Sequence, residues 1–254
     1  VVIDSEQWHR LTAVLSRLVR AGVRIGFGTN ERRKLYSHVI DYHQDRPELQ
    51  SFFDLLRPLT VEPLEGHGSN PFLEIPGEEK QRTEQLLGDF RERRYIVLFP
   101  GASIPERRWG AEPFHQLAFQ LNQYGYPIVV IGGEEDREAG EQIVAGADGL
   151  NLAGRTTLIG SAAVIEKAAL LVSGDSGMLH VGIGLGKPTV SLFGSGIAAK
   201  WAPKGGAHVV INKQLACSPC TRFGYTPPCP IQVKCLKDIS ADEVLSAALS
   251  LLKR

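Results

Sequence analysis

The sequence predicts an α/β protein organised around a doubly wound parallel sheet. In residues 94–211, short apolar runs alternate with segments of helical spacing. Within them, residues 168–196 read as a buried strand, a glycine-bounded turn, a short helix and a second apolar strand. Two strands joined by one short helix belong to the same parallel sheet. In such sheets, ligands bind at the carboxyl ends of strands, where helix N-termini present free N–H groups.

The elements expected in this larger part follow in regular order. Strands are predicted over residues 95–99, 127–131, 150–152, 168–173, 189–193 and 208–211. Helices are predicted over residues 78–91, 112–124, 134–145, 158–168, 178–185 and 240–252. The last helix opens with a capping box formed by Ser240 and Glu243.

The first 59 residues predict part of a second α/β unit. Residues 1–4 and 23–27 are apolar enough for strands, and residues 35–59 are expected to be rich in helix, with Pro47 opening a second half. Residues 8–21 carry an apolar stripe at helical spacing, so we expect that stripe to face the core beneath an arginine-rich outer face. Residues 63–77 are rich in turn formers and predict a linker. The predicted division is therefore 1–75, 76–239 and a terminal helix at 240–254.

Composition narrows the classes of function. The 254 residues include 43% hydrophobic and 22% charged residues, as in ordinary globular proteins. The 28 Lys and Arg residues balance the 28 Asp and Glu residues. Because the chain has no net positive charge, a nucleic-acid partner is not expected. No apolar run approaches the ~20 residues of a membrane span. The first residues lack the basic region of a signal peptide, so a cytoplasmic protein is expected.

The turn after the strand at 168–173 holds the strongest candidate site. Asp175 and Ser176 are both good helix N-caps, Gly177 permits close approach to the backbone, and His180 follows one turn later. One polar residue suffices to cap a helix, so this excess predicts an anion site, most simply for phosphate. The alternative is a well-capped helix in which His180 is an ordinary surface residue.

Two motifs here resemble glycosyltransferase family 9, the lipopolysaccharide heptosyltransferases. The stretch D-S-G-M-L-H-V-G-I-G-L-G-K-P-T-V-S-L-F-G is similar to the family's donor-site signature, with Gly182 and Gly184 where the family usually has alanine. The stretch P-G-A-S-I-P-E-R-R-W resembles a second motif whose basic residue, which neutralises the donor pyrophosphate, corresponds to Arg107. Gly110 stands where that motif usually has proline.

The resemblance implies a fold of the GT-B type, with two Rossmann-like domains of which the N-terminal one is incomplete. It implies inverting transfer of a heptose from ADP-heptose to a lipopolysaccharide core acceptor, with no cofactor or metal in the chemistry. The nucleotide-sugar would bind the second domain and the acceptor the first, in the cytoplasm or peripherally at the inner membrane. Donor contacts are expected from Gly101, Ser103, Arg107, Glu135, Thr156, Thr157, Asp175, Ser176, Gly177 and His180. Glu135 has an equally good alternative explanation: a carboxylate in the first turn of a helix is favoured by the helix dipole and needs no ligand.

Two other functions remain open at this point. One is a nucleotide-sugar epimerase on the same fold, and the other is a protein that binds a nucleotide-sugar without catalysis. In the family, a strand and a loop with the aspartate base precede the segment resembling V-V-I-D, so the resemblance implies an N-terminally truncated chain. We therefore expect donor binding with negligible transfer, and Asp4 is only a weak substitute for the base.

Residues 194–199 match the fingerprint of dinucleotide-binding proteins poorly, because no carboxylate lies about 20 residues further on.

The four cysteines lie together near the end of the chain. They are Cys217, Cys220, Cys229 and Cys235. The C-x-x-C pair suits a structural zinc site, but the second pair has a looser spacing than a zinc ribbon. Free or redox-labile thiols are the alternative, since disulfides are disfavoured in a reducing cytoplasm.

Overall fold

The computed structural model describes residues 1–59 and 71–253, which form two compact units. Unit 1 consists of Val1–Gly68, Ala199–Trp201 and Thr221–Tyr225. Unit 2 consists of Ser69–Ala198, Ala202–Cys220 and Thr226–Arg254. No sequence pattern predicts that two short segments of the second half belong with unit 1. Most of the predicted linker lies outside the described residues, and its end, Gly77, is the first residue of a helix.

Unit 2 contains a six-stranded sheet in which every pairing is parallel, as predicted. Its strands are β4 (Ile96–Phe99), β5 (Ile128–Val130), β6 (Gly149–Asn151), β7 (Leu170–Gly174), β8 (Thr189–Phe193) and β9 (His208–Asn212). Their spatial order is β6-β5-β4-β7-β8-β9. Counted from β4 as the first strand, this is the order 3-2-1-4-5-6 of dinucleotide-binding sheets.

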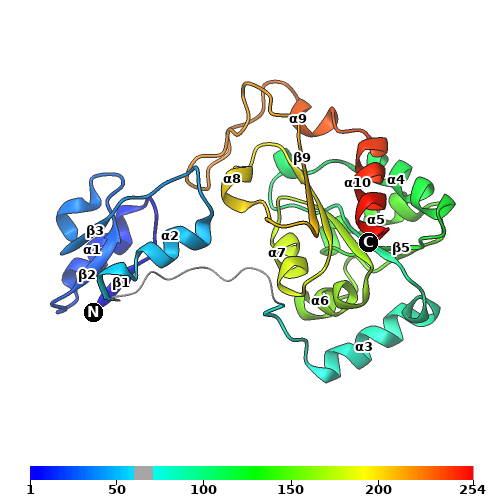
Figure 1. The fold of residues 1–254 in the computed structure, drawn as a ribbon, viewed down its shortest axis with the longest axis horizontal. Coiled ribbons are helices and arrows are strands. Elements are labelled where there is room, and N and C mark those ends of the chain that lie inside the picture. Colours follow the sequence, from blue (N-terminus) through cyan, green and yellow to red (C-terminus); the bar gives the residue numbers. More distant parts are fainter. Residues whose placement is uncertain (60–70, 254) are drawn as a thin grey trace. The chain divides into compact units, whose positions relative to one another are not determined.

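Helices cover both faces of this sheet (Figure 1). They are α3 (Gly77–Leu87), α4 (Ala111–Gln123), α5 (Arg137–Val144), α6 (Leu158–Lys167), α7 (Gly177–Gly184), α9 (Lys234–Lys237) and α10 (Ala241–Leu252), with 3-10 turns at Gly88–Glu92, Pro105–Arg107 and Glu134–Asp136. Successive residues of a strand point to opposite faces. Accordingly, Ile96 and Leu98 pack in one core with α4 and α10, whereas Val97 packs in a second core with α6. The central strands are mostly apolar because both of their faces are buried, and the polar residues among them are Ser173 of β7 and Thr189 and Ser191 of β8.

Unit 1 has a smaller parallel sheet of order β1-β2-β3. Its elements are β1 (Val2–Asp4), α1 (Arg10–Leu18), β2 (Arg24–Phe27), the 3-10 turn Arg32–Leu35, β3 (His38–Ile40), α2 (Glu48–Asp54) and the 3-10 turn Arg57–Leu59. The expectation of helix from residue 35 onward was wrong at β3. There, Val39 and Ile40 are β-branched and pair with β2, and this pairing outweighs the local helical spacing. Pro47 directly precedes α2, close to its predicted place.

The orientation of α1 reverses the prediction. Its inward face consists of Ala13 and Ser16, which are buried, whereas Leu11, Leu15 and Leu18 are 69%, 53% and 73% exposed. Small side chains let the helix backbone lie close to the strands, and the apolar stripe then points away from the sheet. Amphipathic spacing correctly predicted a helix but not which of its faces packs.

This orientation predicts opposite sensitivities for two positions on α1. Ala13→Leu should lower the free energy of unfolding by about 1–3 kcal/mol, because a larger side chain overpacks the closed interface. Leu15→Gln should change it by no more than about 0.5 kcal/mol, because that side chain lies in solvent. Urea unfolding followed by circular dichroism measures both. A larger loss for Leu15→Gln than for Ala13→Leu would contradict the orientation described here.

Candidate functional site

The site lies where the sheet of unit 2 changes its direction of winding. From β4 the chain proceeds to β5 and β6 on one side, and then to β7, β8 and β9 on the other. Helices on opposite faces leave a crevice at such a reversal, beyond the carboxyl ends of the two central strands. Phe99 of β4 pairs with Ser173 of β7, so the loops that follow begin side by side.

An ion pair joins these two loops. Nη1 of Arg107, from the loop after β4, lies 3.3 Å from Oδ2 of Asp175, from the turn after β7. Asp175 is 5% exposed. Two buried atoms of this pair, Nε of Arg107 and Oδ2 of Asp175, have no hydrogen-bond partner. Among the described residues of unit 2, only Gln120 adds a third such side-chain atom, so two of the three in this unit belong to the Arg107–Asp175 pair.

The turn after β7 forms the predicted helix start. Ser176 is the N-cap of α7, and its Oγ accepts a hydrogen bond from the N–H of Leu179 at 3.3 Å. The same Oγ lies 2.8 Å from Oγ of Ser173 at the end of β7. A Cβ added to Gly177 would meet no atom within 4 Å, so the first turn of α7 is open to an approaching ligand. The positive end of the helix dipole favours an anion at this place.

The charges of the site are perturbed by burial. Burial raises the pKa of Asp175, against the opposing effects of Arg107 and His180. Burial lowers the pKa of His180, and the nearby Asp175 opposes that shift. His180 is therefore neutral at neutral pH, and an anion bound close to it would favour its protonation.

The loop after β8 closes the site from a third side. A Cβ on Gly196 would lie 2.0 Å from Oδ2 of Asp175, and a Cβ on Gly174 would lie 2.9 Å from the backbone oxygen of Arg107. Oγ of Ser195 donates to the backbone oxygen of Glu106 at 3.3 Å. From the sequence alone, residues 194–199 are notable only as a poor match to a dinucleotide-binding fingerprint. In the structure, the absence of a side chain at Gly196 leaves room for the carboxylate of Asp175.

A second ion pair in this region was missed. Arg108 donates from Nε and Nη2 to the backbone oxygen of Ala102, at 3.2 and 2.9 Å, and from Nη1 to Asp136 at 3.0 Å. Asp136 is buried and accepts the N–H of Gly133 at 3.1 Å. The pair thus fixes the loop after β4 against the loop after β5. Because Arg107 and Arg108 are adjacent and of the same type, the sequence does not indicate which of them pairs with Asp136.

The other predicted donor contacts lie on loops after β4, β5 and β6. Thr157 caps α6 by accepting the N–H of Gly160 at 3.0 Å, and Oγ1 of Thr156 lies 2.7 Å from Oγ of Ser161. Both hydroxyls therefore have local partners. Glu135 lies in the 3-10 turn Glu134–Asp136, and Gly101 packs against Asp136. Donor binding by these residues, and by Ser103, stays a prediction.

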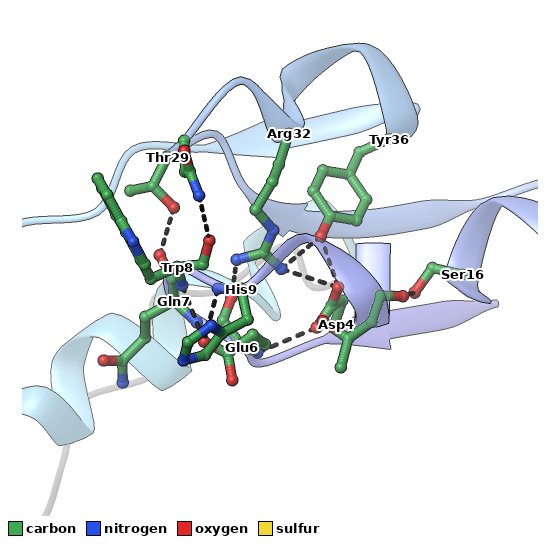
Figure 2. A network of polar contacts seen from close by, with 11 residues as sticks. Asp4, Glu6, Gln7, Trp8, His9, Ser16, Thr29, Arg32 and Tyr36 are labelled. Atoms are coloured by element: carbon green, nitrogen blue, oxygen red, sulfur yellow. Dashed lines mark hydrogen bonds and ion pairs between the residues drawn. The ribbon is translucent and has the colours of Figure 1, made fainter. Parts of the chain in front are cut away.

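In unit 1, Asp4 belongs to a buried polar network (Figure 2). Its Oδ2 accepts hydrogen bonds from Nη2 of Arg32 at 2.8 Å and from the hydroxyl of Tyr36 at 2.6 Å. Its Oδ1 accepts a hydrogen bond from the backbone N–H of Glu6 at 3.0 Å. The side chain of Arg32 is wholly buried, so it needs this carboxylate as its counter-ion. These contacts give Asp4 a structural role, and a role for it as a base stays a prediction that they do not favour.

The four cysteines are all free thiols, from exposed Cys217 to buried Cys235. Within residues 1–59 and 71–253, no group of three or more His, Cys, Asp and Glu side chains is gathered so that it could hold a metal. The prediction of structural zinc therefore finds no support. In the same residues, no helix combines the length and the apolar character needed to cross a bilayer.

Comparison with known proteins decides the family. The model of glycosyltransferase family 9 (heptosyltransferase) matches residues 2–227. This chain belongs to that family. It is 35% identical over 131 residues to lipopolysaccharide heptosyltransferase 2 of Escherichia coli K12, an alignment that covers 49% of this chain and 38% of that protein. Alignments with the first curated relatives cover about two fifths of those relatives' length.

Solved structures agree on the fold. A family 9 glycosyl transferase from Veillonella parvula superposes with a TM-score of 0.79 at 23% identity, over 100% of this chain and 74% of that one. The E. coli ADP-heptose lipopolysaccharide heptosyltransferase II gives 0.70 at 26% identity, over 95% and 73%. The predicted α/β fold of the GT-B type is confirmed.

Proposed function

We propose that unit 2 binds a nucleoside diphosphate sugar in the crevice between Arg107 and Asp175. The observation that carries this proposal is the pair of orphaned buried atoms, one an N–H donor on a cation and one a carboxylate oxygen. Leaving a buried polar atom without a hydrogen bond costs about 1–3 kcal/mol. A ligand with an anionic oxygen beside a hydroxyl satisfies both, and a sugar diphosphate has this combination.

The proposed reaction is transfer of the sugar with inversion at its anomeric carbon. As the bond to the diphosphate breaks, negative charge develops on the leaving oxygens. Arg107, the backbone N–H groups at the start of α7 and His180 would stabilise that charge, whereas Asp175 would accept a hydrogen bond from the sugar. In this scheme, charge stabilisation comes from the chain's own residues, and we propose no cofactor.

The names of relatives support the finer assignment. One solved E. coli structure is named ADP-heptose lipopolysaccharide heptosyltransferase II, and a curated E. coli relative is named lipopolysaccharide heptosyltransferase 2. We propose ADP-heptose as the donor, a lipopolysaccharide core sugar as the acceptor, unit 1 as the acceptor side, and action at the cytoplasmic face of the inner membrane. Among the described residues we assign no base, because Asp4 is fully engaged with Arg32 and Tyr36.

Calorimetry against ADP, UDP, GDP and dTDP tests the donor proposal. ADP should bind most tightly, and Arg107→Met or His180→Gln should weaken it roughly ten- to a hundredfold, since a hydrogen bond to a charged group is worth about 1.5–3 kcal/mol. Arg93→Met is the matched control, because Arg93 pairs with Asp148 just before β6, at the amino end of the strands. Unchanged ADP affinity in both site variants would overturn the assignment.

Donor binding should also take up protons. Burial lowers the pKa of His180 in the free protein, and a diphosphate beside it would raise that pKa again, so binding below about pH 6.5 should protonate the imidazole. An ADP-sugar is the proper ligand, because its diphosphate diester does not itself titrate in this range. Calorimetry at pH 6 in buffers of different ionisation enthalpy measures the uptake, which His180→Gln should remove. Proton release by the wild type would place His180 outside the diphosphate's field.

A further inference from the structure

The apolar stripe of α1 lies on the face of the helix that is opposite to its packed face. It consists of four exposed residues, Leu11, Val14, Leu15 and Leu18. At 3.6 residues per turn, the centre of this set lies about 180° around the helix from the centre of the buried Ala13 and Ser16. α1 packs on β1, β2 and the 3-10 turn Arg32–Leu35. The stripe therefore points away from the elements on which the helix packs.

A neighbouring helix in the same layer would not cover this stripe. Helices that lie side by side on one sheet contact each other along their flanks, about 90° around the helix from the face that meets the sheet. The face opposite to the sheet is left for solvent or for a separate partner. A helix face in solvent normally carries polar residues, whereas a contiguous exposed apolar surface marks an interaction site. The stripe thus indicates a partner outside the helix layer.

The segment that carries the stripe is basic, although the whole chain is neutral. Residues 7–30 contain four arginines and no aspartate or glutamate. Arg17 and Arg20 are exposed, and neither side chain is engaged in a hydrogen bond or ion pair with the residues that the structure describes. Arg17 lies about 110° around the helix from the centre of the stripe, so its aliphatic part can lie along apolar surface while its guanidinium stays at a polar edge. These charges are complementary to an anionic partner.

Most other cations of unit 1 are already paired with carboxylates of the same unit. The pairs are Arg10 with Glu31, Arg32 with Asp4, Arg33 with Asp41, Arg46 and Arg57 with Asp54, and Lys200 with Glu48. Lys200 belongs to α8 (Ala198–Trp201), of which Ala199–Trp201 is part of unit 1. The uncompensated charge of Arg17 and Arg20 therefore lies beside the exposed apolar surface.

A second copy of the chain fits this surface poorly. A helix of nine residues is about 14 Å long, so a contact confined to it buries far less than the ~800 Å² per partner of a stable interface. Two copies paired through α1 would also bring arginines of like charge together. A bilayer sets no such requirement of area and shape, because its affinity rises with each apolar side chain that enters it and with each cation beside its anionic lipids.

We propose that α1 docks unit 1 on a membrane surface that contains anionic lipids. The helix lies parallel to the surface, with its stripe at the boundary between headgroups and acyl chains and with Arg17 and Arg20 paired to lipid phosphates. Nine residues are too few to cross the bilayer. This inference deepens the proposed function and rests on it for the choice of the inner membrane, where the proposed acceptor is held.

Vesicle flotation of the 254-residue protein, without nucleotide, tests the proposal. The wild type should bind vesicles of phosphatidylethanolamine and anionic phosphatidylglycerol, and about tenfold or more weakly those of phosphatidylcholine, which have no net charge. Arg17→Gln/Arg20→Gln should weaken binding to the anionic vesicles about thirtyfold, the effect of two cations at an anionic surface. Leu15→Gln/Leu18→Gln should weaken it about tenfold or more, because two side chains no longer enter the bilayer favourably.

Matched double variants control for the change in surface composition. Leu49→Gln/Leu59→Gln removes two leucines of unit 1 outside α1, which are 52% and 46% exposed. Arg82→Gln/Lys237→Gln removes two exposed cations of unit 2. Both controls should bind the anionic vesicles like the wild type. Circular dichroism checks that each variant is folded.

The outcomes separate this proposal from the donor proposal. It is overturned if the wild type binds no vesicles or binds both kinds equally, if either α1 variant binds like the wild type, or if the controls lose as much. A wild-type dimer that Leu15→Gln/Leu18→Gln converts to monomers in sedimentation would assign the stripe to a second copy instead. Should the leucine variant fail to fold, the arginine variant decides. ADP binding without vesicle binding contradicts only the role of α1, and vesicle binding without ADP binding contradicts only the donor site.

Discussion

The ion pair between Arg107 and Asp175 depends on the winding of the sheet in unit 2. The two residues are far apart in sequence, and they meet because β4 and β7 are neighbours at the point where the strand order reverses. The surrounding contacts serve this arrangement: glycine at position 196 leaves room for the carboxylate, and the ion pair of Arg108 and Asp136 fixes the loop that carries Arg107. A different strand order would separate the two charges and remove the site.

The site is held in an incompletely satisfied state. Two of its buried polar atoms lack hydrogen-bond partners, while the strands beneath them are mostly apolar and almost entirely buried. A rigid sheet can tolerate such a local cost of a few kcal/mol, and binding a ligand that supplies the missing partners recovers it. In unit 1, by contrast, Asp4 accepts hydrogen bonds from both Arg32 and Tyr36, so this buried carboxylate has its partners within the unit.

The sequence predicted unit 2 well because continuous apolar strands, capped helices and glycine-bounded turns are local signals. Ser176, a good helix N-cap by residue type, is the N-cap of α7, and Arg107 and Asp175, which the motif resemblance singles out, form an ion pair. The predictions that failed concern contacts between residues distant in sequence, which a local sequence pattern does not indicate. The apolar stripe of α1 faces away from the sheet because Ala13 and Ser16 fit against it, and His38–Ile40 pairs as a strand only because β2 lies beside it. Asp136 and Lys200 depend on partners distant in sequence, which no spacing rule identifies.

A structure of the protein with ADP bound tests the central claim most directly. The account predicts that a diphosphate oxygen accepts a hydrogen bond from Nε of Arg107, at about 2.7–3.0 Å, while the same diphosphate lies at the N-terminus of α7. It also predicts that the sheet and the contacts of Gly196 stay unchanged. ADP bound elsewhere, with Nε of Arg107 still lacking a partner, would contradict it.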